Sequence, residues 1–258
     1  MATFNWSYTM KLLAHIGLIA SLGLASHAMA SPLTFFGQDR GVFTQDGAPT
    51  GAGFANSMAA RADFLSNLTG VGTESFESAT VGTAAPLALT FPGAGTATLN
   101  GGGVVTNVPG TGQNATTGSN WWRTGAGNNF VITFDSPIAA FGFYGIDVGD
   151  VGAQLTLTLS SGSSIAIDIP HTVEAGGPGS GQNGSVIFFG YIDEANPWTS
   201  ATFSNLGGGG ADDFGFDDMT IGSIEQVNRT PEPGSLPLIA AAALAGFGLK
   251  RRRGQAGN

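Results

Sequence analysis

Four aspartates toward the C-terminal end of the chain are the residues best placed to do chemistry. Asp212, Asp213, Asp217 and Asp218 lie within seven residues and follow a run of four glycines. Carboxylates this close repel one another unless water, a proton or a metal ion relieves the charge. Calcium prefers six to eight oxygen ligands, which carboxylates and backbone carbonyls supply. The pattern therefore indicates either a calcium site or a solvated acidic loop without an ion, and the sequence leaves both open.

Residues for enzymatic catalysis are scarce in the rest of the chain. There is no cysteine, and His171 is the only histidine after residue 30. The sequence has no Gly-x-Ser-x-Gly or His-Glu-x-x-His motif and no lysine between residues 31 and 233. Two acids can act together as a glycosidase pair, but the sequence does not locate such a pair. We therefore expect no catalytic residues, and a glycan-active enzyme is the less favoured alternative.

Two adjacent tryptophans form the second candidate site. Trp121 and Trp122 follow a polar stretch and precede Arg123. Neighbouring strand residues point to opposite faces of a sheet, so both rings cannot enter the same face. An exposed ring offers a stacking surface for a sugar. In the alternative interpretation, which the sequence favours, one ring packs in the core and the other covers a sheet edge.

Charge is distributed unevenly along the chain. The net charge is −9, and residues 31 to 233 hold all 18 acids against four arginines. A nucleic-acid partner requires a basic face, so this composition excludes one. The absence of cysteine excludes disulfides and thiolate metal sites. With 42% hydrophobic residues, the chain is rich enough in apolar side chains to fold around a core despite its 42 glycines.

The first 30 residues predict a secretory signal peptide. Lys11 precedes an apolar run from Leu12 to Leu24, and Ala28 and Ala30 form a small-x-small cleavage pattern. The alternative is a retained anchor helix, but the apolar run is short for a membrane span. We therefore expect a signal helix that is removed after Ala30.

Residues 228–258 form a three-part tail. Pro231-Glu232-Pro233 is followed by an apolar segment over residues 236–249 and by the basic cluster Lys250-Arg251-Arg252-Arg253. A helix of this length reaches about 21 Å, less than the roughly 30 Å hydrocarbon core of a bilayer. The basic cluster holds its own end of the helix in the cytoplasm. The tail therefore predicts a short hydrophobic helix that anchors the chain only transiently.

This tail resembles the PEP-CTERM sorting signal of Gram-negative, biofilm-forming bacteria, and the resemblance covers residues 230–253. It implies that an exosortase-type enzyme processes the chain near the Pro-Glu-Pro, while the chain is transiently held in the inner membrane. It also implies delivery to the cell surface or to the exopolysaccharide matrix. An ordinary C-terminal membrane anchor is the alternative.

The body of the chain has the two-residue period of β-strands, as in residues 130–134, 155–159 and 165–169. Further strands, separated by turn residues, are expected at 104–108, 138–146, 185–192, 200–206 and 214–227. One short helix is predicted over 56–69, where Gly70 ends it. We therefore predict an all-β fold, an antiparallel β-sandwich or jelly roll over residues 74–227. It follows an irregular N-terminal arm over 31–73 that carries the helix. A β-solenoid is the alternative, but no fixed repeat supports it.

Three stretches, residues 70–77, 134–145 and 214–222, are similar to a family of uncharacterised secreted bacterial domains. Their layout looks like that of jelly-roll carbohydrate-binding and lectin-like modules. The resemblance implies that an early strand pairs with a late one and that a structural calcium ion joins the two. Its implied ligands are Glu77, with Glu74 as a further ligand, and Asp217 or Asp218.

These features together predict a non-catalytic, secreted protein of the cell surface or exopolysaccharide matrix, with weak glycan binding and structural calcium. A purely structural matrix protein without a ligand is the first alternative. Ice binding would need a flat, regular array of threonines. The sequence shows only the strand pairs Thr96-x-Thr98 and Thr156-x-Thr158, so ice binding is a less favoured alternative.

Overall fold

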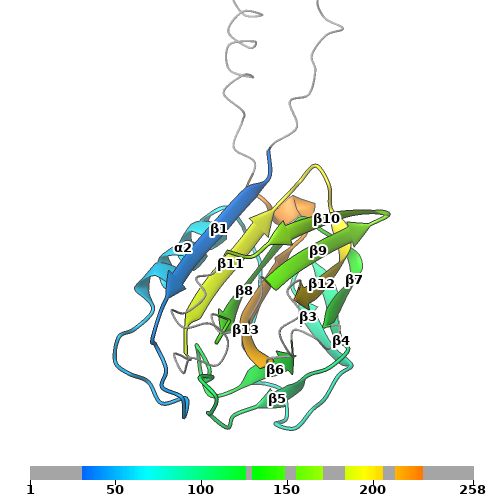
Figure 1. Ribbon diagram of the computed structural model, residues 1–258. Helices are drawn as coiled ribbons and strands as arrows, with labels where there is room; N and C mark the ends of the chain where they lie inside the picture. Colours follow the sequence, from blue (N-terminus) through cyan, green and yellow to red (C-terminus); the bar gives the residue numbers. More distant parts are fainter. Residues whose placement is uncertain (1–30, 126–129, 149–154, 171–183, 206–212, 229–258) are drawn as a thin grey trace, which may run out of the picture. The chain divides into compact units, whose positions relative to one another are not determined.

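The computed structural model describes residues 31–125, 130–148, 155–170, 184–205 and 213–228 (Figure 1). The predicted signal peptide and sorting tail lie outside these residues, as do His171 and Asp212. The described chain forms two antiparallel sheets and one α-helix. In this part of the chain, no helix has the length and apolar character needed to span a bilayer.

The first sheet, called sheet A here, has the strand order β1-β11-β8-β13-β6-β5, and β2 pairs with β13. Its strands are β1 (Leu33–Asp39), β2 (Thr73–Glu74), β5 (Val104–Thr106), β6 (Trp121–Gly125), β8 (Ala140–Ile146), β11 (Val186–Ile192) and β13 (Asp213–Gly222). The pairing of Glu74 with Met219 joins an early strand to the last one. This early-to-late pairing agrees with the jelly-roll expectation.

The second sheet, called sheet B here, has the order β10-β9-β12-β7-β4-β3. Its strands are β3 (Leu87–Phe91), β4 (Gly95–Asn100), β7 (Val131–Ile138), β9 (Leu155–Ser161), β10 (Ser163–Asp168) and β12 (Trp198–Asn205). Every pairing within the two sheets is antiparallel. The predicted all-β sandwich is therefore confirmed.

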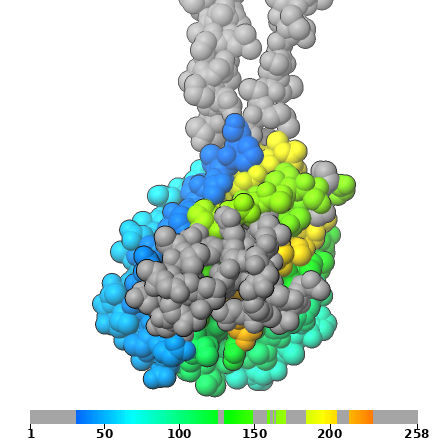
Figure 2. Space-filling view, in the orientation of Figure 1, coloured from blue at the N-terminus to red at the C-terminus, as the bar shows by residue number. Residues whose placement is uncertain are grey.

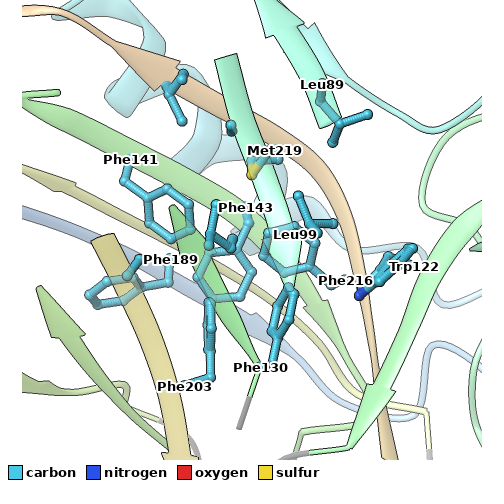
Figure 3. Packing of buried hydrophobic residues seen from close by; sticks show 14 of the residues in the cluster. Leu89, Leu99, Trp122, Phe130, Phe141, Phe143, Phe189, Phe203, Phe216 and Met219 are labelled. Carbon is cyan, nitrogen blue, oxygen red and sulfur yellow. The ribbon is translucent and has the colours of Figure 1, made fainter. Parts of the chain in front are cut away.

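Aromatic rings fill the space between the two sheets (Figure 3). The ring centroid of Phe216 in sheet A lies 4.9 Å from that of Phe143 and 5.8 Å from that of Phe203 in sheet B. Phe130 and Phe203 stack with centroids 5.0 Å apart. Such pairs add specific ring contacts to the free energy of burying apolar area. This cluster holds the two sheets together.

A second apolar cluster lies on the outer face of sheet A, under helix α2 (Ala55–Ser66). Phe64 of this helix lies over the facing pair Gly142 and Gly190 of strands β8 and β11. A Cβ atom at Gly142 would come within 2.8 Å of the Phe64 ring, and one at Gly190 within 2.7 Å. Glycine at both positions therefore lets the ring approach the sheet backbone.

The two sheets differ in how far they are covered. Strands β8 and β11 are buried at every residue, as is β13 after Asp213. Strands of sheet B instead alternate, as in β7, where Ile132 and Phe134 are buried and Thr133 is exposed. Sheet A is thus enclosed on both faces over these central strands, whereas sheet B keeps an outer face toward solvent. In Figure 2, residues 31–70 (blue to cyan) lie on one side of the molecule and the β9–β10 hairpin (light green) at the upper right.

The N-terminal arm and two element ends differ from the sequence-based expectation. Residues 33–39, expected to be irregular, form edge strand β1, in which the adjacent Phe35 and Phe36 break the simple alternation. Helix α2 spans 55–66, close to the predicted 56–69. The last strand ends at Gly222 and not at 227, because Ser223 caps a short 3-10 turn.

Replacing Phe64 by alanine should destabilise the fold by about 3–5 kcal/mol, since the ring is fully buried over the Gly142–Gly190 pair. Met58→Ala on the same helix is the matched control, because Met58 is 55% exposed. Urea-induced unfolding of both variants measures the difference. Equal midpoints for Phe64→Ala and Met58→Ala would show that α2 is not docked as described.

Candidate functional site

Carboxylates from two distant parts of the chain converge on the segment over residues 114–120, called the carboxylate-bound loop here. The Asp217 carboxylate, on β13, receives the largest number of donors. Its Oδ2 accepts hydrogen bonds from the backbone N–H and the hydroxyl of Thr116, at 2.8 and 2.7 Å. Thr117 N–H donates to the same oxygen at 3.4 Å, and Oδ1 accepts from Asp218 N–H at 2.8 Å. The side chain is fully buried, so these donors replace the water it has lost.

Asp218 occupies an irregularity in β13 that brings a second carboxylate to the same loop. The register with β8 shifts between Asp217 and Thr220, and Asp218 has a left-handed φ of 48°. Such a bulge lets two successive side chains leave the normal alternation. Asp218 Oδ1 accepts a hydrogen bond from the hydroxyl of Thr117 at 2.8 Å. Its Oδ2 is buried without a hydrogen bond and lies 3.9 Å from Arg61 Nη2 of helix α2.

Glu77 holds the other end of the carboxylate-bound loop. Its Oε1 accepts hydrogen bonds from the backbone N–H groups of Ser119 and Asn120, at 2.7 and 2.6 Å. Glu74 is used within its own turn, where Oε1 accepts the N–H of Phe76 at 2.6 Å. Glu77, Asp217 and Asp218, expected to gather around calcium, thus meet at one loop through its backbone and hydroxyl donors.

Arg61 and Tyr144 complete the buried polar cluster on the outer face of sheet A. Tyr144 lies opposite Asp217 in the β8–β13 register. The Arg61 guanidinium carbon lies 5.8 Å from the centroid of the Tyr144 ring, a cation–π geometry. Burial raises the pKa of Tyr144 to about 12, with Arg61 opposing and the nearby aspartates adding to the increase. Tyr144 is therefore a neutral phenol at any physiological pH.

The two aspartates do not share the ordinary pKa of a carboxylic acid. Burial, followed by the neighbouring Asp218 carboxylate, raises the pKa of Asp217 to about 7, although the hydrogen bonds from Thr116 oppose the increase. Burial also raises the pKa of Asp218, against the effect of Thr117 and Arg61. Both carboxyls therefore have a pKa above that of an ordinary aspartate.

The described carboxylates do not fit a calcium ion in this arrangement. Glu77 Oε1 and both oxygens of Asp217 already face N–H or O–H donors, and Asp218 faces the cationic Arg61. Among the residues that the structure describes, no group of three or more histidine, aspartate or glutamate side chains is placed to hold a metal. Asp213 forms a separate, partly exposed ion pair with Arg123 at 2.7 Å. Calcium binding stays a prediction, in part because Asp212 lies outside the described residues.

Neither tryptophan offers a stacking surface to solvent, which corrects the interpretation of Trp121 and Trp122 as glycan contacts. Trp121 is 1% exposed and Trp122 is 0% exposed. Trp122 points between the sheets and stacks on Phe76 at 6.2 Å. Trp121 points to the opposite, outer face of sheet A beside Gly215. The interpretation that the sequence favoured places one ring in the core, as Trp122 is. Trp121 is buried on the opposite face, although Arg123 on that same face of β6 is exposed.

Sequence reasoning missed the surface that the structure leaves open, the outer face of sheet B. Its strands turn hydroxyl side chains outward, and we call this surface the hydroxyl face. Described members whose side chains are exposed or half-exposed are Thr90, Thr96, Thr98, Thr133, Thr158, Ser164, Ser200, Thr202 and Ser204. Part of the signal was present in the sequence, because serine and threonine are the commonest residues at the outward positions of these strands. What the sequence did not show is that six strands align these residues on one face.

Of the comparisons with known proteins, only the comparison with solved structures finds similar chains. The sequence matches no protein-family model, and a search of curated proteins gives no significant match. The K2 cleaved adhesin domain of Lys-gingipain is 18% identical, with a TM-score of 0.37 over 58% of this chain and 97% of that one. The carbohydrate-binding module CBM29-2 is 10% identical, with a TM-score of 0.27 over 77% and 100%. TmCBM61, solved with β-1,4-galactotriose, is 15% identical, with a TM-score of 0.24 over 48% and 86%.

These similarities are to β-rich binding domains and are distant. At such identities and scores they carry no information on what this chain binds. The functional conclusion therefore depends on the residues of this chain.

The buried Asp217 carboxyl should make stability depend on pH. Its pKa is about 7 in the folded chain and ordinarily 3.8, so the folded state holds this proton more tightly than the unfolded state. Its stabilising contribution is fully present below about pH 4 and is lost as the pH rises to about 7. We expect the free energy of unfolding to fall over this range in the wild type and to fall less in Asp217→Asn.

Chemical denaturation at several pH values measures this dependence, with Asp63→Asn on the exposed side of α2 as the control. Parallel pH profiles for the wild type and Asp217→Asn would contradict the assignment.

Proposed function

We propose that this chain is a secreted, non-catalytic protein of the cell surface or exopolysaccharide matrix whose β-sandwich binds glycans. The observation that carries the proposal is the use of the acids that converge on the carboxylate-bound loop. Glu77 and Asp217 serve as acceptors for the carboxylate-bound loop, which gives both carboxyls a structural role. Among the described residues, the candidate calcium ligands Glu77, Asp217 and Asp218 therefore each bind a group of the protein itself.

The charge of the chain supports a neutral glycan as the ligand. Four arginines stand against 18 acids between residues 31 and 233. A body with this charge repels anionic polymers and binds uncharged ones without an electrostatic penalty. Hydroxyl side chains on an open sheet face form the same kinds of hydrogen bond as sugar hydroxyls do.

The two ends of the chain support the location. The signal pattern ending at Ala28 and Ala30 would send the body across the inner membrane. The PEP-CTERM-type tail would then hold it there until an exosortase-type enzyme acts near Pro231-Glu232-Pro233. The protein would reach the surface or the matrix of a Gram-negative cell, where exopolysaccharide is abundant.

Glycan binding and catalysis are separated by one pair of measurements on the full chain. We expect retention of the protein on insoluble neutral polysaccharides and no release of reducing ends from them. Both assays are run with calcium and with a chelator, and binding lost only with the chelator would support structural calcium. No retention under either condition would favour a structural matrix protein without a ligand. Released reducing ends that disappear on substitution of an acid pair would favour an enzyme.

Tail processing is tested by replacing Pro231 and Pro233 with alanine in a host that carries an exosortase. Without the rigid extended segment the processing site is lost, so the variant should keep its full mass and stay in the membrane fraction. Pro170→Ala, an exposed proline of the body, is the control. Equal processing of the two variants would contradict the sorting assignment.

A further inference from the structure

The hydroxyl face of sheet B is ordered in rows that run across the strands. In one row, Thr98 of β4 lies opposite Thr133 of β7, which in turn lies opposite Ser200 of β12. In the strand register, Ser200 also lies opposite Ser160 of β9, and Ser160 lies opposite Ser164 of β10. The structure therefore aligns five hydroxyl-bearing residues, from five neighbouring strands, side by side.

A second row lies two residues further along each strand. Thr158 of β9 faces Thr202 of β12, which faces Val131 of β7. Neighbouring strands are about 4.8 Å apart, and alternate residues of one strand are about 6.7 Å apart. The first row thus holds five hydroxyl-bearing residues and the second holds two, with Val131, Ala166 and Asn100 at its other positions, and the backbone sets the spacing of both rows.

Several of these hydroxyls have no hydrogen-bond partner among the residues that the structure describes. In the part of the chain that the structure describes, no hydrogen bond engages the hydroxyl of Thr98, Thr158 or Thr202. Thr133 is partly engaged, because it accepts a hydrogen bond from the Asn100 amide at 3.2 Å. The unengaged hydroxyls are each free to donate one hydrogen bond and to accept two.

The hydroxyl face also lacks positive charge. The described arginines belong to other parts of the fold: Arg40 follows β1, Arg61 is on α2 and Arg123 is on β6. Its acids are Asp135 of the inner strand β7, which accepts the backbone N–H of Thr96, and Asp168, which ends the edge strand β10. Threonine is common in strands for its β-propensity alone, but an ordinary solvent-facing sheet also carries lysine, arginine and glutamate.

We propose that the hydroxyl face is the glycan-binding surface and that its ligand is an ordered, neutral polysaccharide. This inference rests on the proposed function and names the surface and the ligand class. The absence of cations on this face disfavours polysaccharides that carry carboxylate or sulfate. No aromatic side chain points outward from the described part of sheet B, so single sugar rings gain no stacking contact. Each hydroxyl contributes only a weak net hydrogen bond, so binding needs many contacts at once, as an ordered polymer surface provides.

The test removes three unengaged hydroxyls without changing side-chain shape. The full chain with Thr98→Val, Thr158→Val and Thr202→Val is compared with the wild type for retention on cellulose, chitin and insoluble β-1,3-glucan. We expect at least about a tenfold loss of affinity for the polysaccharide that the wild type binds. Cellohexaose and alginate should bind neither protein measurably. Valine is favourable in exposed strands, so thermal unfolding should stay unchanged.

The matched control carries the same change at three exposed threonines outside sheet B, Thr34→Val, Thr69→Val and Thr80→Val. Its affinity should equal that of the wild type. Thr202→Glu is a second single variant that places a carboxylate in the middle of the second row, and it should abolish retention even if the triple variant folds poorly.

The possible outcomes separate the two proposals. Retention of the wild type that persists in the triple variant and in Thr202→Glu would overturn the hydroxyl face as the site, while glycan binding itself would stand. No retention of the wild type would overturn both. Shaping of ice crystals, or self-association lost in the triple variant, without polysaccharide binding would assign the face to ordered water or to a second copy and overturn the proposal.

Discussion

The enclosure of sheet A on both faces is the constraint on which the rest of the structure depends. A strand with no face toward water must be apolar throughout or must give each polar group an internal partner. Strands β8 and β11 meet the first condition with near-continuous runs of phenylalanine, isoleucine and glycine. Strand β13 meets the second, because Asp217 and Asp218 are buried within it and receive donors from Thr116 and Thr117.

This constraint separates the structural polar residues from those available to a ligand. The cluster of Arg61, Tyr144, Asp217 and Asp218 couples helix α2, β8, β13 and the carboxylate-bound loop, so its charges are used in holding the fold. Sheet B has the opposite character, with an apolar inner face against the aromatic core and a hydroxyl-rich outer face. The largest group of aligned, solvent-facing hydroxyl side chains described above is therefore on sheet B.

The same asymmetry explains what could be predicted from the sequence. The clearest period-two patterns, near Ile132, Leu157 and Ile167, all belong to sheet B, where one face meets water. The sequence favours one tryptophan in the core, as Trp122 is, whereas the complete burial of Trp121 on the opposite face depends on tertiary contacts around β6 that no local pattern specifies. The partner of Asp217 is 101 residues away in Thr116, and no local pattern encodes that contact. The alignment of Thr98, Thr133 and Ser200 likewise follows from strand register, which short-range spacing does not specify.

Strand β1 sets the order in which the domain can assemble. It is the first strand of the body to be synthesised, yet its only neighbour in sheet A is β11, which begins at Val186. Strand β2 likewise pairs with β13, the last strand that the structure describes, and so cannot pair until β13 has been made. Contacts this distant in the chain make folding slow and leave early strands unpaired while later ones are made. The two pairings β1–β11 and β2–β13 can therefore form only after nearly all of the described chain has been made, so sheet A is completed late.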